Sequence, residues 1–196
     1  MKAVLKSSIP EASHQLSEDG FEILNGVLPL ADCQILADEL TRLHQKQKES
    51  SGVKLGGLRN LLRLNSTVAK LASADAVKAI ICSRVHVDVF PVRALFFDKT
   101  PDANWGVAWH QDLSIAVVDR SETPGFSGWS VKEGVVHVQP PPPILEGMVT
   151  LRLHLDDCTA ENGALKVIPG SHRQGRLSAT AIAVWSQDRL TVTCGR

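Results

Sequence analysis

Hydrophobic and polar positions follow two different periods along this chain. In the first third, apolar residues recur at three- and four-residue steps over residues 30–48 and again over residues 66–83, which predicts two amphipathic helical regions. Pro29 suits the start of the first helix, and Ser73, followed by Asp75, is a candidate cap for a new helix within the second region. The first part of the chain is therefore expected to be mainly helical.

From residue 84 onward, the pattern changes to short segments with the alternation and β-branched content of strands. Turn signals rich in Gly, Pro, Asn and Asp separate them. Helices followed by many short strands indicate an α+β protein whose second part is a small antiparallel sandwich or barrel. The predicted strands cover residues 85–90, 93–97, 106–109, 114–118, 135–139, 149–155 and 164–168.

The segment 119–143 is rich in Gly, Ser and Pro and ends in four consecutive prolines. A linker between domains is one interpretation, but a solvated linker has no need of apolar side chains such as Trp129. We favour a long loop over the mouth of the sandwich, with the prolines as a stiff extended edge, because such loops often act as lids. The lid residues that are candidates to touch a substrate are Trp129, Lys132 and Gln139. Lys132 suits either an anionic group of the substrate or a simply solvated position on the lid.

Composition and charge exclude several classes of protein. The chain of 196 residues has 21 Lys+Arg against 21 Asp+Glu, which does not fit a protein that wraps nucleic acid. The longest stretch without a charged residue, 134–145, contains four prolines and is far shorter than the ~18 apolar residues of a membrane-spanning helix. The four cysteines have no paired spacing, which favours reduced thiols in a cytoplasmic protein. The oligomeric state stays open.

Three histidines are each followed, two residues later, by an aspartate. On an extended chain such residues face the same side, so each pair is able to present an imidazole and a carboxylate to one metal ion. The pairs are His86 with Asp88, His110 with Asp112, and His154 with Asp156.

The sequence around these pairs distinguishes them. His86 and Asp88 alternate with valines, as on the solvated face of a strand, and His154 and Asp156 share a face with Arg152, as in a surface row of ion pairs. The third pair, His110 and Asp112, is set among Trp105, Trp109 and Leu113, and bulky aromatic neighbours suit a site that excludes water. A metal site and a structural His–Asp hydrogen bond both remain open for it.

The motif Trp-His-Gln-Asp at residues 109–112 is followed by segments 153–165 and 168–175, which contain Leu-His-Leu-Asp-Asp and Ile-Pro-Gly-Ser-His-Arg. This order, together with segments 18–21 and 97–99, resembles the phytanoyl-CoA dioxygenase family of iron(II)/2-oxoglutarate oxygenases. The resemblance implies one domain over residues 1–196, with helical support over 1–83. It also implies a double-stranded β-helix, or jelly-roll, core over 84–196.

The resemblance also implies an activity and a set of site residues. His110 and Asp112 match two members of a facial triad that binds Fe(II), leaving positions for 2-oxoglutarate and O2. The expected reaction is hydroxylation of a small-molecule substrate with decarboxylation of 2-oxoglutarate to succinate. Arg59, Phe97 and Arg152 correspond to positions near the co-substrate. His172 belongs to a turn signature and is not expected to bind iron.

The family's third ligand, a histidine, and its carboxylate-binding arginine come from strands after the loop that begins at Pro169. Here residues 178–188 suggest a helix, 190–194 the start of a strand, and no histidine follows His172. We therefore expect a truncated chain that lacks the last strands of its barrel and has little turnover. Two alternatives are a non-catalytic jelly-roll binding module and a zinc-dependent hydrolase that uses His110, Asp112 and another histidine.

Overall fold

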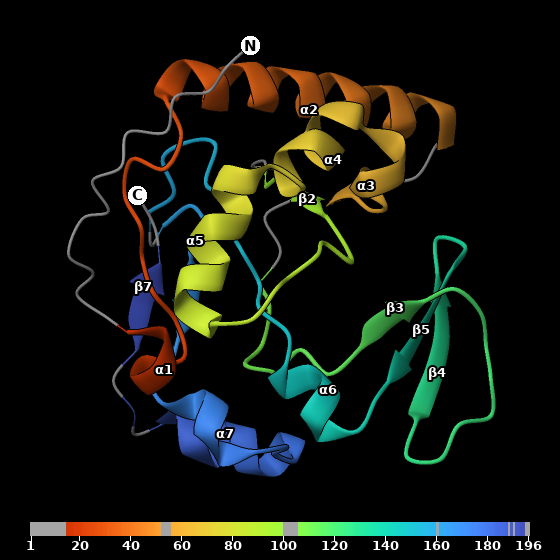
Figure 1. Cartoon of the computed structure of the whole chain (residues 1–196), viewed down its shortest axis with the longest axis vertical. Coiled ribbons are helices and arrows are strands. Elements are labelled where there is room, and N and C mark those ends of the chain that lie inside the picture. Colours follow the sequence, from red (N-terminus) through yellow and green to blue (C-terminus); the bar gives the residue numbers. More distant parts are fainter. Residues whose placement is uncertain are drawn as a thin grey trace. The chain divides into compact units, whose positions relative to one another are not determined.

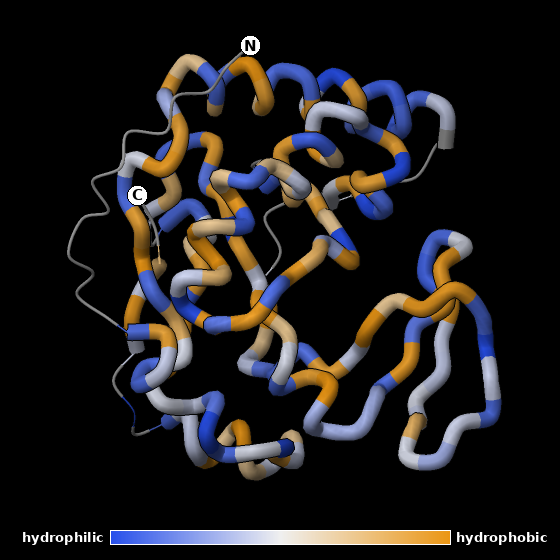
Figure 2. Tube along the Cα trace, in the orientation of Figure 1, coloured by the Kyte–Doolittle hydropathy of each residue, from blue (hydrophilic) through white to orange (hydrophobic). Residues whose placement is uncertain are grey.

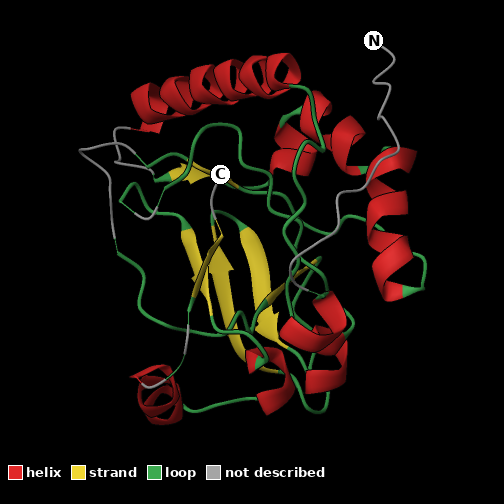
Figure 3. Ribbon diagram, turned by 90° about the vertical axis from the view of Figure 1, so that its left-hand side faces the viewer, coloured by secondary structure: helices red, strands yellow, loops and turns green. Residues whose placement is uncertain are grey.

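The computed structural model describes residues 15–51, 56–99, 106–159, 161–187, 189 and 191–194. These residues form an α+β structure with helices and small antiparallel sheets (Figures 1 and 3). They belong to two compact units. The helical unit comprises the described residues of Met1–Val107, Arg152–Arg173 and Arg189–Arg196, and the hairpin unit comprises those of Ala108–Leu151 and Gln174–Asp188.

The helices of the helical unit agree well with the predicted helical regions. The first predicted helix is α2, in which apolar and polar residues alternate around the axis (Figure 2). The second region is two helices, because α4 ends at Ala72 and α5 begins at Asp75. Ser73 is not the cap of α5, since Ala74 holds that position. The helices are α1 (Leu16–Asp19), α2 (Leu30–Ser51), α3 (Leu61–Leu64), α4 (Ser66–Ala72) and α5 (Asp75–Val85), followed later by the 3-10 turn η2 (Ser171–Gln174).

The core of the helical unit forms where α2 meets a short strand and the helix after it. Leu36 and Leu40, one turn apart on α2, pack with Leu58 and Leu61 in one buried cluster. Strand β1 (Gly57–Leu58) pairs antiparallel with β2 (Phe96–Phe97). A second pair, β6 (Leu165–Val167) with β7 (Val192–Cys194), confirms the strands predicted at 164–168 and 190–194.

The hairpin unit is built on a three-stranded antiparallel sheet in the order β3–β5–β4 (Figure 1). Glu133 and Gly134 join β4 to β5 with φ of 50° and 76°, the two left-handed residues of a tight hairpin turn whose twist matches that of the strands. Val138 on β5 is completely buried. The elements are β3 (Ile115–Val117), β4 (Ser127–Lys132), β5 (Val135–Gln139), α6 (Pro142–Glu146) and α7 (Ala179–Gln187).

Several expectations from the sequence are wrong. Residues 85–90 are not a strand, because α5 continues to Val85 and His86 ends it with a left-handed φ of 55°. Residues 106–109 and 149–155 have no strand, and within 93–97 only β2 forms. Segment 119–143 is not a long loop, since it contains the β4–β5 hairpin. Pro142 and Pro143 begin α6 instead of forming an extended edge.

Candidate functional site

His110 and Asp112 lie just before β3, in a segment of the hairpin unit that has no regular secondary structure. The His110 Nδ1 is 2.8 Å from the carbonyl oxygen of Ala108. A carbonyl oxygen only accepts hydrogen bonds, so Nδ1 carries the proton and donates it. In the neutral ring, Nε2 then keeps its lone pair. The Nε2 atom is 3.8 Å from Asp112 Oδ1, which is too long for a hydrogen bond and leaves both atoms available to a ligand.

The surroundings of this pair are open. The side chain of His110 is 57% exposed and that of Asp112 is 94% exposed. Trp109 is itself 38% exposed, and Trp105 lies outside the described residues. The shielding expected from bulky aromatic neighbours is therefore not observed in the part of the chain that the structure describes.

Gln111, between the two candidate ligands, is the residue that sequence reasoning missed. Its side-chain Nε2 donates to the Gly175 carbonyl at 2.7 Å, and its Oε1 accepts from the Leu177 backbone N–H at 2.8 Å. The only signal for it in the sequence is its place between two residues that face the same side, which turns its own side chain to the other side.

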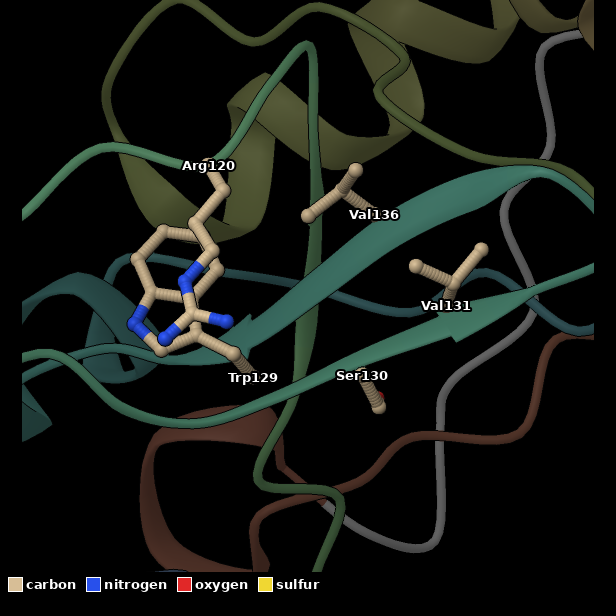
Figure 4. A pocket seen from close by; sticks show the side chains of 5 residues that line it. All are labelled: Arg120, Trp129, Ser130, Val131 and Val136. Carbon is tan, nitrogen blue, oxygen red and sulfur yellow. The ribbon is translucent and has the colours of Figure 1, made fainter.

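A shallow hollow of about 160 Å³ opens on the sheet of the hairpin unit (Figure 4). The Arg120 guanidinium lies over the Trp129 ring, 5.7 Å from its centroid, in a cation–π arrangement. The apolar side of the hollow comes from Val131 and Val136, and Ser130 completes its lining. Trp129, one of the three lid residues expected to touch a substrate, therefore lines this hollow, whereas Lys132 and Gln139 are not part of its lining.

The other two lid residues have different surroundings. Lys132 is exposed at the end of β4. Gln139 Oε1 accepts a hydrogen bond from the Arg176 guanidinium at 2.6 Å, so this side chain already has a partner within the unit.

A family model described as phytanoyl-CoA dioxygenase (PhyH) matches residues 16–184. The chain belongs to the phytanoyl-CoA dioxygenase family. A search of curated proteins and a search of solved structures found no match. Members of this family are generally 2-oxoglutarate-dependent oxygenases, and the match includes His110, Asp112 and Gln111.

The residues that the phytanoyl-CoA dioxygenase resemblance associates with the co-substrate lie in the helical unit. Gly57 pairs with Phe97 in the β1–β2 ladder, and Arg59 follows β1 directly, so the fold brings Arg59 and Phe97 to one ladder. The ladder is close: a side chain on Gly57 would collide with the Phe96 carbonyl oxygen. Arg59 is half-buried and Phe97 is 56% exposed.

Arg152, the third of these residues, is exposed and acts on two titratable neighbours. Partial burial lowers the pKa of His154, the positive charge of Arg152 lowers it further, and Asp156 opposes both effects. Burial raises the pKa of the Cys194 thiol, and Arg152 acts in the opposite direction. Arg152 therefore acts electrostatically on both His154 and Cys194.

His172 makes a structural contact to the start of the chain. Its Nε2 is 3.3 Å from the Ser17 carbonyl oxygen, to which Arg173 also donates at 2.8 Å. Gly20 ends α1 with a φ of 81°, and a Cβ at this position would collide with the His172 imidazole. The two motifs 18–21 and 168–175 therefore pack against each other, and His172 serves that packing.

Two absences complete the description. Among the residues that the structure describes, no group of three His, Cys, Asp or Glu side chains is arranged to hold a metal ion. The helices in the same ranges include none with the length and apolar character needed to cross a membrane.

Proposed function

We propose that this chain is an iron(II)- and 2-oxoglutarate-dependent oxygenase that hydroxylates a small organic substrate. The observation that carries the proposal is the pair of open ligand atoms, His110 Nε2 and Asp112 Oδ1, in a member of the phytanoyl-CoA dioxygenase family. The jelly-roll core and a cytoplasmic location belong to the same proposal, and the four free thiols agree with a reducing compartment.

The two side chains suit Fe(II) in chemical type. An imidazole nitrogen and a carboxylate are two of the three ligands in the facial triad of non-haem iron oxygenases. The hydrogen bond from His110 Nδ1 to the Ala108 carbonyl is the kind of contact that fixes the tautomer of a metal-binding histidine. The Asp112 carboxylate, 94% exposed and 3.8 Å from His110 Nε2, would supply the second ligand.

Iron(II) bound there would supply the redox chemistry that couples the decarboxylation of 2-oxoglutarate by O2 to hydroxylation of the substrate. His110 and Asp112 would hold the metal, with Ala108 keeping the imidazole in the tautomer that leaves Nε2 open. No third ligand accompanies them in a cluster within the described ranges. We therefore expect weak iron binding and slow turnover.

The remaining candidate residues are assigned to the co-substrate and the substrate. Arg59 and Arg152 each carry the positive charge that a 2-oxoglutarate carboxylate needs, and the exposed Phe97 ring offers an apolar surface. Trp129 would contact the substrate in the hollow of Figure 4, and Lys132 would meet an anionic group. Gln139 would contribute only if its bond to Arg176 were exchanged for one to the substrate.

The test is an anaerobic titration with iron(II) and 2-oxoglutarate. Chelation of iron by the keto acid is expected to produce a visible charge-transfer band. Asp112→Ala should abolish this band, whereas Asp88→Ala, which removes the exposed aspartate of another His-x-Asp pair, should leave it unchanged.

Two results would contradict the oxygenase assignment. Absence of the band in the unmodified chain would favour a non-catalytic binding module. Stoichiometric zinc in protein prepared without added metal, together with no effect of 2-oxoglutarate, would favour a zinc-dependent hydrolase.

A further inference from the structure

The side chain of Gln111 is hydrogen-bonded to another segment of the hairpin unit, residues 175–177. His110 and Asp112 are exposed, but Gln111 between them is half-buried, as expected for alternating sides of an extended chain. Its carboxamide uses both of its polar atoms: Nε2 donates to the Gly175 carbonyl at 2.7 Å, and Oε1 accepts from the Leu177 N–H at 2.8 Å. This two-bond contact is called the Gln111 clasp below.

The segment that receives the clasp is itself held in place. Gly175 has a left-handed φ of 60°, a conformation that other residues rarely adopt. Arg176, the next residue, donates to Gln139 Oε1 at 2.6 Å, and Gln139 is the last residue of β5. Strand β5 carries Val138, the most deeply buried residue of the hairpin unit. The clasp therefore connects the His-Gln-Asp segment to the buried strand of this unit through a short chain of hydrogen bonds.

We infer that Gln111 is a positioning residue that holds His110 and Asp112 in the arrangement needed by a metal ion. This inference rests on the proposed function. Two exposed side chains on a free segment would lose more conformational freedom when they bind a metal than two side chains on a restrained segment. The clasp restrains their common backbone from the opposite side, so it lowers this cost without touching the metal.

The chemistry of the clasp requires a carboxamide of this length. One polar atom has to donate to a carbonyl oxygen and the other has to accept from an N–H, which a glutamine does and a leucine of similar size does not. Asparagine keeps both groups on a side chain that is one methylene shorter. Gln111→Leu thus removes both bonds, whereas Gln111→Asn keeps the chemistry and shortens the reach.

The experiment measures the dissociation constant of Co(II), a spectroscopic substitute for Fe(II), by its visible absorption in the whole chain. Gln111→Leu should raise this constant roughly tenfold, the usual scale for residues that support a metal ligand, and Gln111→Asn should raise it less. The matched control is Gln45→Leu, because Gln45 is an exposed glutamine of α2 whose side chain also makes one hydrogen bond, to Glu49 at 3.3 Å. Gln45→Leu should leave the constant unchanged.

Circular dichroism at the titration temperature separates positioning from folding, and Gln111→Asn serves if Gln111→Leu does not fold. A folded Gln111 variant that binds Co(II) as tightly as the unmodified chain overturns the inference. His110→Ala distinguishes this outcome from failure of the proposed function. If His110→Ala weakens Co(II) binding and the Gln111 variants do not, the inference alone is wrong. If His110→Ala has no effect, the ligand assignment itself is wrong.

Discussion

The helical unit and the hairpin unit each contain a histidine close to an aspartate, in opposite environments. In the helical unit, His44 Nδ1 lies 3.0 Å from Asp98 Oδ2, and the His44 side chain is only 1% exposed. The Phe96 ring meets the imidazole edge to face at 6.2 Å. In the hairpin unit, His110 and Asp112 are 3.8 Å apart and open to solvent.

The difference shows why proximity of histidine and aspartate does not by itself make a metal site. The Asp98 carboxylate accepts a hydrogen bond from His44 Nδ1, so the two groups are hydrogen-bonded to each other. A metal ion bound at this carboxylate oxygen would have to displace that hydrogen bond. At the second pair, the backbone carbonyl of Ala108 accepts the hydrogen bond from His110 Nδ1. Both Nε2 and the Asp112 carboxylate then stay open. The buried pair supports the fold, and we assign the open pair to binding.

The largest effect on stability is expected for the buried pair. His44→Ala removes a buried ring and leaves Asp98 without this partner, so it should lower the free energy of unfolding by about 2–4 kcal/mol. Asp98→Asn keeps an acceptor for Nδ1 and should cost about 1 kcal/mol. Urea unfolding followed by circular dichroism measures both values. Equal stability of His44→Ala and the unmodified chain would remove the structural role of this pair.

For the exposed pair, His110 and Asp112, substitution should change metal binding strongly and stability very little. Asp112→Asn should weaken Co(II) binding about tenfold, because it removes the charge of a ligand, and change the free energy of unfolding by less than about 0.5 kcal/mol, since the side chain is 94% exposed. Asp88→Asn is the control for removing an exposed charge. A large loss of stability in Asp112→Asn would mean that this pair, like the first, supports the fold.

The smallest effect concerns His154, the half-buried histidine of the pair His154 and Asp156. Burial and Arg152 lower its pKa below the usual 6.5. As the pH falls, the unfolded chain therefore binds a proton at this residue at a higher pH than the folded chain does. The contribution of His154 to the free energy of unfolding is present above pH 6.5 and is lost as the pH falls through its lower folded pKa. NMR titration should find this low pKa, and Arg152→Gln should raise it. Arg63→Gln, at the end of α3, is the control and should not move it.

The hydrophobic periodicity of the sequence predicted correctly those helices and strands whose conformation depends mainly on residues nearby in the chain. The helix predicted at 30–48 and the strands at 114–118 and 135–139 are present with small changes of length. The strand predicted at 85–90 is absent because α5 extends two residues beyond the predicted helix, to Val85, and His86 ends it with a left-handed φ of 55°. Strand β4 and its hairpin with β5 were not predicted, because the high Gly and Pro content of the segment was interpreted as a loop. The two-residue turn lies at Glu133 and Gly134.

The sequence alone determined the open pair, since His110 and Asp112 are two residues apart and an extended chain turns both to one side. Only the tertiary structure decided the contacts that span the chain. Asp98 reaches His44 across 54 residues, Gly175 reaches Gln111 across 64, and His172 reaches Ser17 across 155. Periodicity records which face of an element is apolar, but it carries no information about which distant segment covers that face. That choice depends on packing and on hydrogen-bond partners that exist only once the chain has folded.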